Sequence, residues 1–250
     1  ASVGNIIGNP FSGWNGELKC LSPYFIYDDK VLFDKDKSKI IAFRDKNTTS
    51  YVIPDSVSCI EFGAFWKCYS LKRLVLPDSV SSIGDWAFWN CRSLTDIVIP
   101  DSVNSIGDRV FSGCCSLKSL VIPDSVSSIG ESAFEDCTSL SSLVIPEGVT
   151  SIGHCAFRGC YSLSNIVIPN GVTSIGGCAF DGCKSLNSVV IPDSVTSIGY
   201  WAFQFCSSLN DIIIPDSVNS IGHGAFWGCN IPNDLKQELS SRFGDKIFGN

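Results

Sequence analysis

The sequence from Pro100 to Ile122 reads PDSVNSIGDRVFSGCCSLKSLVI, and the same pattern begins again at Pro123. Prolines recur every 23 residues, at positions 54, 77, 100, 123, 146, 169, 192 and 215. A fixed period of this length is the sequence signature of a solenoid, in which each repeat adds one turn to a continuous stack. We therefore predict that the 250-residue chain is organised by one elongated array.

The repeat divides into fixed and variable positions when its proline is taken as position 0. From Pro54 to Cys229, position +3 is always Val, +6 Ile, +11 Phe and +14 Cys, while +7 is nearly always Gly, +10 Ala and +17 Leu. Positions +19 to +22, as in residues 119–122, alternate and are rich in β-branched side chains, which predicts a strand. The next proline ends that strand because it has no N–H for the ladder. Ala-Phe-x-x-Cys suits a 3₁₀ or single helical turn.

The pattern divides the chain into three segments. Residues 1–53 are predicted to hold a degenerate repeat, with Trp14 in the cysteine slot, and then an inserted β-meander with strands at 25–27, 31–33 and 40–43. Residues 54–229 are the array of eight 23-residue repeats, and residues 230–250 are a C-terminal cap. The chain contains no Met, and the first repeat lacks its proline, so we expect the native protein to extend further N-terminally.

The cap is predicted to be an amphipathic helix over residues 233–243. Asn233 is a suitable N-cap, Leu235, Leu239 and Phe243 share one face, and Gly244 is a suitable terminator. Such a helix would cover the last exposed repeat, as solenoids require. The acidic run that begins at residue 34 imitates a calcium-binding loop, but Lys replaces its central Gly, so a polar hairpin turn is predicted there.

The repeat L-x-x-I-x-I-P-x-x-V-x-x-I-G-x-x-A-F-x-x-C-x-S resembles that of BspA-like leucine-rich-repeat proteins over residues 54–229, and residues 117–122 resemble the LxxLxL strand segment. The resemblance implies an α/β-type solenoid, a right-handed superhelix of mostly strand and coil. Its parallel β-sheet would lie on the concave face and short 3₁₀ or turn segments on the convex face. The resemblance also implies a bacterial protein, secreted or displayed on the cell surface, that binds a protein partner as adhesins do. It identifies no binding residue.

Composition and motifs argue against several other functions. The formal net charge of −7 is unsuited to nucleic acid, and no apolar run is long enough to span a bilayer. The two histidines, His154 and His223, fall at the variable +8 position, and no nucleophile, base and orienting acid recur together. We therefore expect no enzymatic activity, no cofactor and no metal. The acidic residues at +1 are interpreted as solvated turn residues, with a basic partner or bound cations as the alternative.

The cysteines are predicted to be buried thiols. Those at +14 occupy an inward position in every repeat, where Cys behaves as a small apolar residue, and a linear ladder does not offer zinc four converging sulfurs. Cys155 and Cys178 form a second pair at +9. They are the best candidates for a disulfide, although free thiols are the favoured interpretation.

Two surfaces are candidate binding sites. The first is the outward face of the strands, where +21 is Val or Ile, as at Val98 and Val121, and +19 is polar, as at Arg73 and Asp96. A shallow apolar groove with a polar margin and simple cross-strand packing are both open interpretations. The second comprises aromatic residues at variable positions, in two groups: Trp86 with Trp89, and Tyr200 with Trp201 and Phe205. These side chains either pack locally between turns or form an interaction surface.

Three functions follow from these surfaces. The first hypothesis is a non-enzymatic surface protein that binds a protein partner through its sheet or its aromatic clusters. The second is a carbohydrate-binding module that uses the tryptophans as stacking platforms. The third is a structural spacer that presents another domain.

Overall fold

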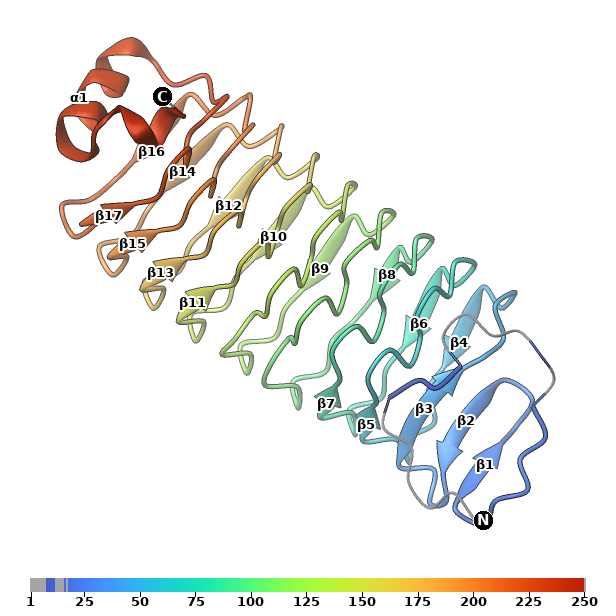
Figure 1. Cartoon of the computed structure of the whole chain (residues 1–250). Helices are drawn as coiled ribbons and strands as arrows, with labels where there is room; N and C mark the ends of the chain where they lie inside the picture. The colour runs from blue at the N-terminus through green and yellow to red at the C-terminus, as the bar shows by residue number, and fades with distance from the viewer. Residues whose placement is uncertain (1–7, 12–15, 17, 250) are drawn as a thin grey trace.

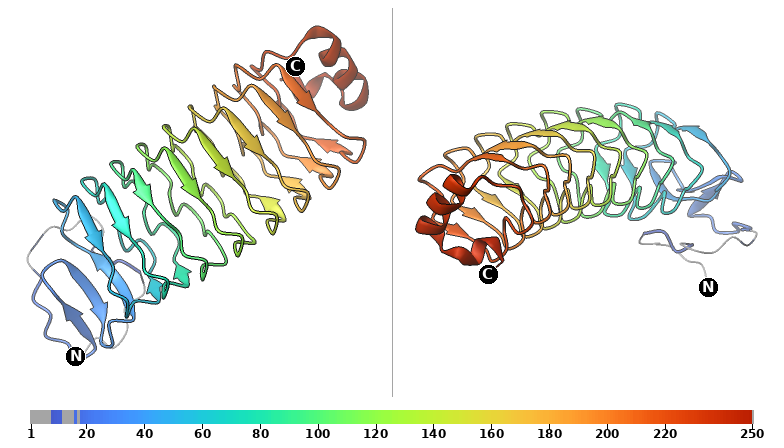
Figure 2. Two further views of the ribbon diagram at one scale, coloured as in Figure 1. Left: turned by 180° about the vertical axis from the view of Figure 1, so that it is seen from behind. Right: turned by 90° about the horizontal axis from the view of Figure 1, so that it is seen from above.

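The computed structural model describes residues 8–11, 16 and 18–249, so the predicted degenerate repeat with Trp14 lies largely outside the described residues. The chain winds into a flattened coil whose turns stack into an elongated, gently arched body, with its ends at opposite extremities (Figures 1 and 2). Parallel strands run along two sides of the coil. The predicted solenoid of strand and coil is confirmed.

The first side, called sheet I, is formed by the predicted strands at +19 to +21. Neighbouring strands are parallel and offset by one repeat, so that Val144 lies beside both Val121 and Val167. The strands pair as β4-β6-β8, β9-β10-β12 and β14-β16. Their bounds are β4 Ser50–Val52, β6 Arg73–Val75, β8 Asp96–Ile97, β9 Ser119–Val121, β10 Ser142–Val144, β12 Asn165–Val167, β14 Ser188–Val190 and β16 Asp211–Ile213.

The second side, called sheet II, is formed by shorter strands at +5 and +6. Isolated bridges at Ile106 and Ile129 continue its line where no strand is formed. Its strands are β5 Cys59–Ile60, β7 Ser82–Ile83, β11 Ser151–Ile152, β13 Ser174–Ile175, β15 Ser197–Ile198 and β17 Ser220–Ile221. In both sheets one side chain points inward and the next outward, as a period of two requires.

The predicted N-terminal meander is present and continues directly into the stack. β1 (Phe25–Tyr27), β2 (Val31–Asp34) and β3 (Lys39–Phe43) are antiparallel neighbours, and β3 then pairs in parallel with β5 of sheet II. Lys39 forms an ion pair with Glu61, which stands where the other repeats have Gly, at 3.3 Å. Residues 39–53 therefore serve as the first turn of the coil.

The core is a column of phenylalanines along the solenoid axis. Eight come from position +11 of the repeats, and all of these are at most 1 % exposed. Successive rings in the column lie 5.0–6.2 Å apart between centroids, most of them stacked. Phe43 begins the column and Phe248 ends it. Each repeat thus buries its aromatic ring only because its neighbours supply both walls.

The segment from +8 to +14 is a chain of tight turns between the two sheets. Its N–H groups bond to carbonyls three residues back and to the next repeat, as in Phe88 to Val110 at 3.0 Å. Positions +9 and +13 adopt positive φ in every repeat, including residues such as Cys155 (54°) and Phe205 (54°). Both sides of the coil are hydrogen-bonded from repeat to repeat, and the stack arches gently (Figure 2). Sheet I marks one side of the coil and sheet II marks another.

The C-terminal cap has two parts. Helix α1 spans Asn233–Phe243, as predicted, and Leu239 is buried while Leu235 and Phe243 pack against the core. Asn233 does not cap the helix, because the cap residue is Pro232, which makes no side-chain hydrogen bond; Gly244 ends the helix with φ 80°. A 3₁₀ helix, η1 (Asp245–Phe248), follows and was not predicted. No helix among the described residues is both long and apolar enough to cross a membrane.

Candidate binding surfaces

Sheet I presents a row of exposed β-branched side chains, which we call the valine stripe. Period-two alternation buries position +20 and leaves +21 in solvent: Val121 and Val144 are 78 % and 71 % exposed. The parallel register stacks these side chains directly beside one another, at about 4.8 Å per strand. The stripe consists of Val52, Val75, Val98, Val121, Val144, Val167, Val190 and Ile213, each at least 40 % exposed.

The margin of the stripe at +19 is polar and mostly small. Ser119 and Ser142 flank its centre, and Arg73 and Asp96 flank its N-terminal part. Arg73 Nε lies 3.8 Å from Asp96 Oδ2, with both side chains more than 60 % exposed. Such an exposed pair contributes about 0–1 kcal/mol, so both groups are free to change partners. The structure places Arg73, Asp96, Val98 and Val121 on one face; their contact with a ligand stays a prediction.

The predicted pair Trp86 and Trp89 belongs to a cluster of three half-buried indoles, the third being Trp66. Their ring centroids lie 4.7–5.6 Å apart, and Trp66 and Trp86 are stacked with an interplanar angle of 13°. Arg109 lies over Trp86 at 4.9 Å, and Lys67 over Trp89 at 5.2 Å. These contacts cover much of the ring faces that a sugar would need. Local packing positions this group, and contact of Trp86 and Trp89 with a ligand stays a prediction.

The second aromatic group is more exposed, and glycines of neighbouring repeats make room for it. Tyr200, Trp201 and Phe205 are 47 %, 38 % and 47 % exposed. A Cβ atom on Gly177, Gly224 or Gly228 would lie within 2.8 Å of the Tyr200, Trp201 or Phe205 ring, respectively. Tyr200 and Trp201 meet edge to face at 5.2 Å, whereas Phe205 pairs with Trp227 at 5.4 Å. The structure thus brings Tyr200 and Trp201 together and assigns Phe205 to a different pair.

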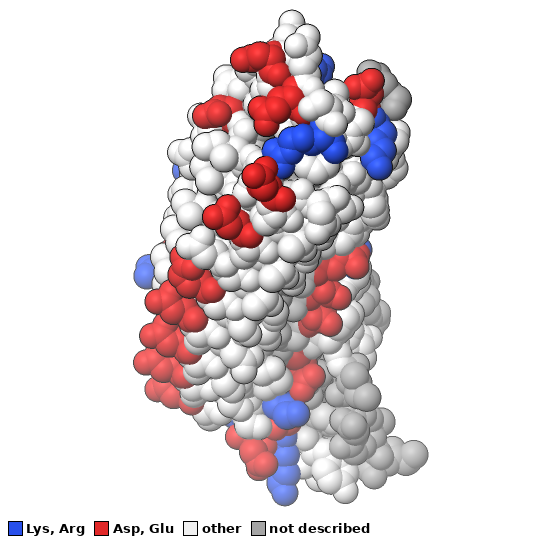
Figure 3. Space-filling model, turned by 90° about the vertical axis from the view of Figure 1, so that its left-hand side faces the viewer, with Lys and Arg blue, Asp and Glu red and all other residues white. Residues whose placement is uncertain are grey.

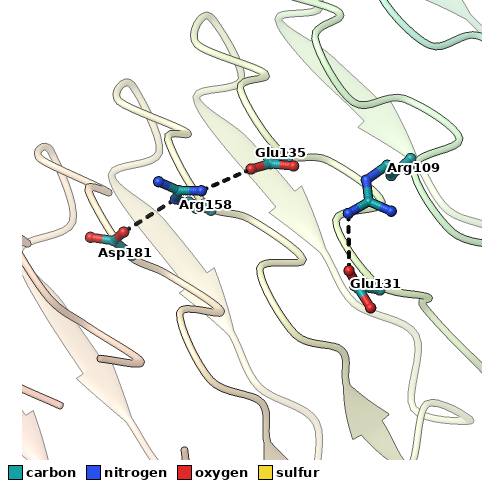
Figure 4. Close-up of polar contacts among 5 residues, drawn as sticks. All are labelled: Arg109, Glu131, Glu135, Arg158 and Asp181. Atoms are coloured by element: carbon teal, nitrogen blue, oxygen red, sulfur yellow. Dashed lines mark hydrogen bonds and ion pairs between the residues drawn. The ribbon is translucent and has the colours of Figure 1, made fainter. Parts of the chain in front are cut away.

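A polar pocket of about 550 Å³ lies on the turn side of the coil. Tyr161 and Phe205 line it together with charged groups. Arg158 joins Glu135 at 3.2 Å and Asp181 at 3.3 Å, so three successive repeats are linked at position +12 (Figure 4). Burial raises the pKa of Asp181, although Arg158 opposes the shift. A second pair, Arg109 with Glu131 at 3.0 Å, lies further along the coil.

The acidic residues predicted at +1 are all exposed. They occupy the turns that follow sheet I, at positions 55, 78, 101, 124, 147, 193 and 216. In the space-filling view, acidic side chains form rows along the coil with few basic side chains between them (Figure 3). Their solvent exposure is that of ordinary turn residues.

Comparison with known proteins gives the family. The BspA-type leucine-rich repeat region matches in six copies, over residues 39–160 and 127–250. The chain belongs to the BspA-type leucine-rich repeat proteins. Its match begins at β3, in agreement with the first turn of the coil described above. A search among functionally curated proteins found no significant match.

Solved structures of leucine-rich repeat proteins share the fold. A leucine-rich repeat protein from Bacteroides ovatus is 31 % identical with a TM-score of 0.73; the match covers 83 % of this chain and 55 % of that one. The T. pallidum leucine-rich repeat protein is 30 % identical with a TM-score of 0.62, over 90 % and 95 % of the two chains. A protein from Eubacterium ventriosum, 24 % identical over 92 % of this chain and 56 % of its own, shares the fold with a TM-score of 0.62.

Sequence reasoning missed several groups of this BspA-type array. Val52 extends the valine stripe by one strand, and Trp66, which the sequence shows as an aromatic residue at a variable position, joins the cluster of Trp86 and Trp89. The column Glu135, Arg158 and Asp181 was also missed, although its members stand 23 residues apart with alternating charge. That spacing was the available signal: in a stacked repeat, residues one period apart are neighbours in space.

The paired cysteines at +9 are free thiols in the structure, which agrees with the favoured interpretation. Cys155 is buried and Cys178 is half-buried. Burial, with a contribution from Cys178, raises the pKa of Cys155 to about 12, and burial also raises the pKa of Cys178. Both thiols are therefore protonated at neutral pH when nothing is bound to them.

Proposed function

We propose that this chain is a non-enzymatic binding protein that recognises a protein partner through the valine stripe, as a secreted or surface-displayed bacterial protein. The observation that carries the proposal is the row of exposed β-branched side chains on parallel strands. A contiguous exposed apolar surface with a polar rim is typical of a protein-interaction site. Membership of a repeat family whose members offer long continuous surfaces supports the same function.

The valine stripe favours protein over sugar as the ligand. Aliphatic side chains bury well against another apolar surface, at about 25 cal/mol per Å², whereas they offer a sugar neither a flat ring nor a hydrogen bond. The small serines beside Val121 and Val144 leave these side chains accessible to a flat or extended partner segment. The ion pair at one end adds polar groups that can fix the partner's register.

The experiment compares two double variants that add the same charge to different faces. Val121→Asp with Val144→Asp alters the stripe, and Ser128→Asp with Ser151→Asp places two carboxylates on exposed positions of sheet II, one repeat apart. We expect the first variant to lose at least about tenfold in affinity for a bound extracellular protein, equivalent to about 1.4 kcal/mol, and the second to bind normally. The measurement is biolayer interferometry against a panel of purified extracellular matrix and bacterial surface proteins.

The same experiment separates the remaining functions. Equal loss in both variants would contradict the assignment to the stripe. Absence of any protein ligand, with glycan-array binding that disappears in Phe205→Ala, would indicate carbohydrate recognition. The pocket lined by Tyr161, Phe205 and carboxylates favours that second function, because ring faces beside acidic acceptors suit a sugar. A chain that binds neither class would be a spacer.

A further inference from the structure

We propose that His154, Cys155 and Cys178 form a binding site for a soft divalent or monovalent metal ion, such as Zn²⁺ or Cu⁺. One ligand atom from each of these side chains lies within 4.8 Å of the other two. In a tetrahedral zinc site, with Zn–S of about 2.3 Å and Zn–N of about 2.0 Å, neighbouring ligand atoms are separated by about 3.5–3.8 Å. A contraction of about 1 Å, within the reach of side-chain rotation, would therefore bring the three atoms to ligand distances.

The chemistry of the donor set limits the metals that fit. Two thiolates and one imidazole are soft or borderline ligands, which favour zinc and copper(I) and disfavour calcium and magnesium. Two thiolates would neutralise a divalent ion. Three protein donors leave the fourth tetrahedral position for water or an external ligand, and half-buried His154 and Cys178 leave the site open to solvent.

Backbone hydrogen bonds between repeats hold the two cysteines in place. The Cys155 N–H bonds to the Gly177 carbonyl at 2.9 Å, and the Cys178 N–H bonds to the Tyr200 carbonyl at 2.9 Å. The inter-repeat ladder thus fixes the distance between the two cysteines. The His154 ring packs against Tyr200, with centroids 5.7 Å apart, and this contact limits its orientation. A site supported in this way needs little reorganisation when it binds an ion.

Position +9 is also an unusual place for cysteine. Cys155 and Cys178 have φ of 54° and 55°, in the left-handed region that favours Gly, which occupies +9 in the first and last repeats. Trp86, Arg109, Ser132 and Trp201 adopt the same positive φ at +9, so the residue type and not the conformation sets these two repeats apart. Of the described repeats, only these two adjacent ones carry Cys at +9, and one of them also carries His at +8. The coincidence of three candidate ligands, two thiols and one imidazole, at one point is what the proposal explains.

The test uses the reduced 250-residue chain and Co²⁺ as a spectroscopic probe of the site. We expect one equivalent of Co²⁺ to give intense thiolate-to-cobalt absorption in the near ultraviolet, with visible bands of a tetrahedral ion, and stoichiometric Zn²⁺ to bleach both. Cys155→Ser with Cys178→Ser should abolish these bands. The matched control, Cys59→Ser with Cys115→Ser, removes two other partly exposed thiols and should leave them unchanged.

His154→Ala separates a ligand from a structural neighbour. It should retain the thiolate absorption but weaken Zn²⁺ binding by more than the roughly 10- to 100-fold that loss of a supporting residue causes. The proposal is overturned if wild-type protein gives no such bands, if the Cys155/Cys178 variant gives the same bands as wild type, or if His154→Ala binds Zn²⁺ as tightly as wild type. Closure of Cys155 and Cys178 into a disulfide in air, without Co²⁺ binding by the reduced protein, would likewise overturn it.

Discussion

At the scale of single residues, the cysteines at +14 do more than fill space. Each thiol from Cys91 onward donates to the carbonyl of a phenylalanine one repeat earlier, as Cys137 does to Phe111 at 3.2 Å. A thiol is small and apolar enough for this column, yet it still satisfies a buried acceptor. The sequence predicted the burial of these cysteines but not their donor role, because spacing alone does not show which carbonyl lies opposite.

The first member of the cysteine column differs from the others. Lys46 Nζ lies 3.3 Å from Cys68 Sγ and also donates a hydrogen bond to the Phe43 carbonyl. Burial alone would raise the pKa of Cys68. The neighbouring Cys91 thiol and the positive charge of Lys46, which donates a hydrogen bond to Cys68, outweigh that effect, so the pKa of Cys68 is lower than usual. Cys68 is thus the thiol of the column best able to carry negative charge.

Because the remaining thiols of the column are buried, we expect the free energy of unfolding to fall at alkaline pH. Burial raises the pKa of Cys137, Cys183 and Cys206 well above the ordinary value of about 9. Below pH 9 both states keep these protons and stability is unaffected; above pH 9 the unfolded chain releases them and the folded chain does not. Each such group should therefore remove up to about 1.4 kcal/mol of unfolding free energy per pH unit.

Urea unfolding at pH 7.5, 9 and 10 measures this effect. We expect Cys137→Ala with Cys160→Ala to lower stability at pH 7.5, through lost packing and hydrogen bonds, and to reduce the alkaline slope. Cys115→Ser, which removes a partly exposed thiol outside the column, is the control and should keep the wild-type slope. An unfolding free energy that stays constant from pH 9 to 10 would contradict the buried, protonated state.

At the scale of elements, the C-terminal cap works by imitating the next repeat. The Gly224 and Phe226 N–H groups bond to the Lys246 and Ile247 carbonyls of η1, both at 2.8 Å, as they would to a following turn. Phe248 then takes the phenylalanine position, with its ring centroid 6.2 Å from that of Phe226. Helix α1 covers the side of the last turn, while η1 closes the hydrogen-bond ladder and the aromatic column.

Phe248→Ala should therefore destabilise the chain more than a similar change in α1. Phe248 is 8 % exposed and ends the ring column, so its truncation should cost about 2–4 kcal/mol. Phe243→Ala removes the same group from the half-buried side of the helix and should cost clearly less. Denaturant unfolding of both variants gives the comparison. Equal losses, or a larger loss for Phe243→Ala, would show that the helix rather than η1 closes the array.

The two ends also show what the sequence could and could not predict. Local spacing was sufficient for α1, because Leu235, Leu239 and Phe243 mark one helical face. It could not predict η1, whose role depends on contacts with Phe226, nor the parallel pairing of β3 with β5. At the candidate site, alternation predicted the exposure of Val98 and Val121, whereas the meeting of His154 with Cys178 depends on adjacency across one period.

At the scale of the whole molecule, stability is a sum over neighbouring turns. Each turn contacts mainly the one before and the one after, through two strand ladders, the turn ladder and the phenylalanine column. Gly at +7 permits the close approach: a Cβ atom on Gly153 would lie 2.7 Å from the Gly130 carbonyl oxygen. A side-chain contact such as that of His154 with Tyr200 reaches two turns, but the strand ladders and the phenylalanine column join adjacent turns, so the length of the array is set by the number of repeats and by its caps.

The chain should therefore accept an additional repeat. A second copy of residues 123–145, inserted after Ile145, preserves every inter-repeat contact on both sides and adds one interface, so we expect a native fold with a higher unfolding free energy. Small-angle scattering should show a particle about 5 Å longer, because one strand spacing is added. The same insertion shortened by one residue is the control: it shifts the strand register, directs valines of the stripe inward, and should lower stability.

If the 23-residue insertion destabilised the protein as much as the 22-residue one, stability would depend on contacts beyond adjacent turns. The stripe gains one valine in the longer protein, so unchanged or stronger protein binding would also agree with recognition along sheet I.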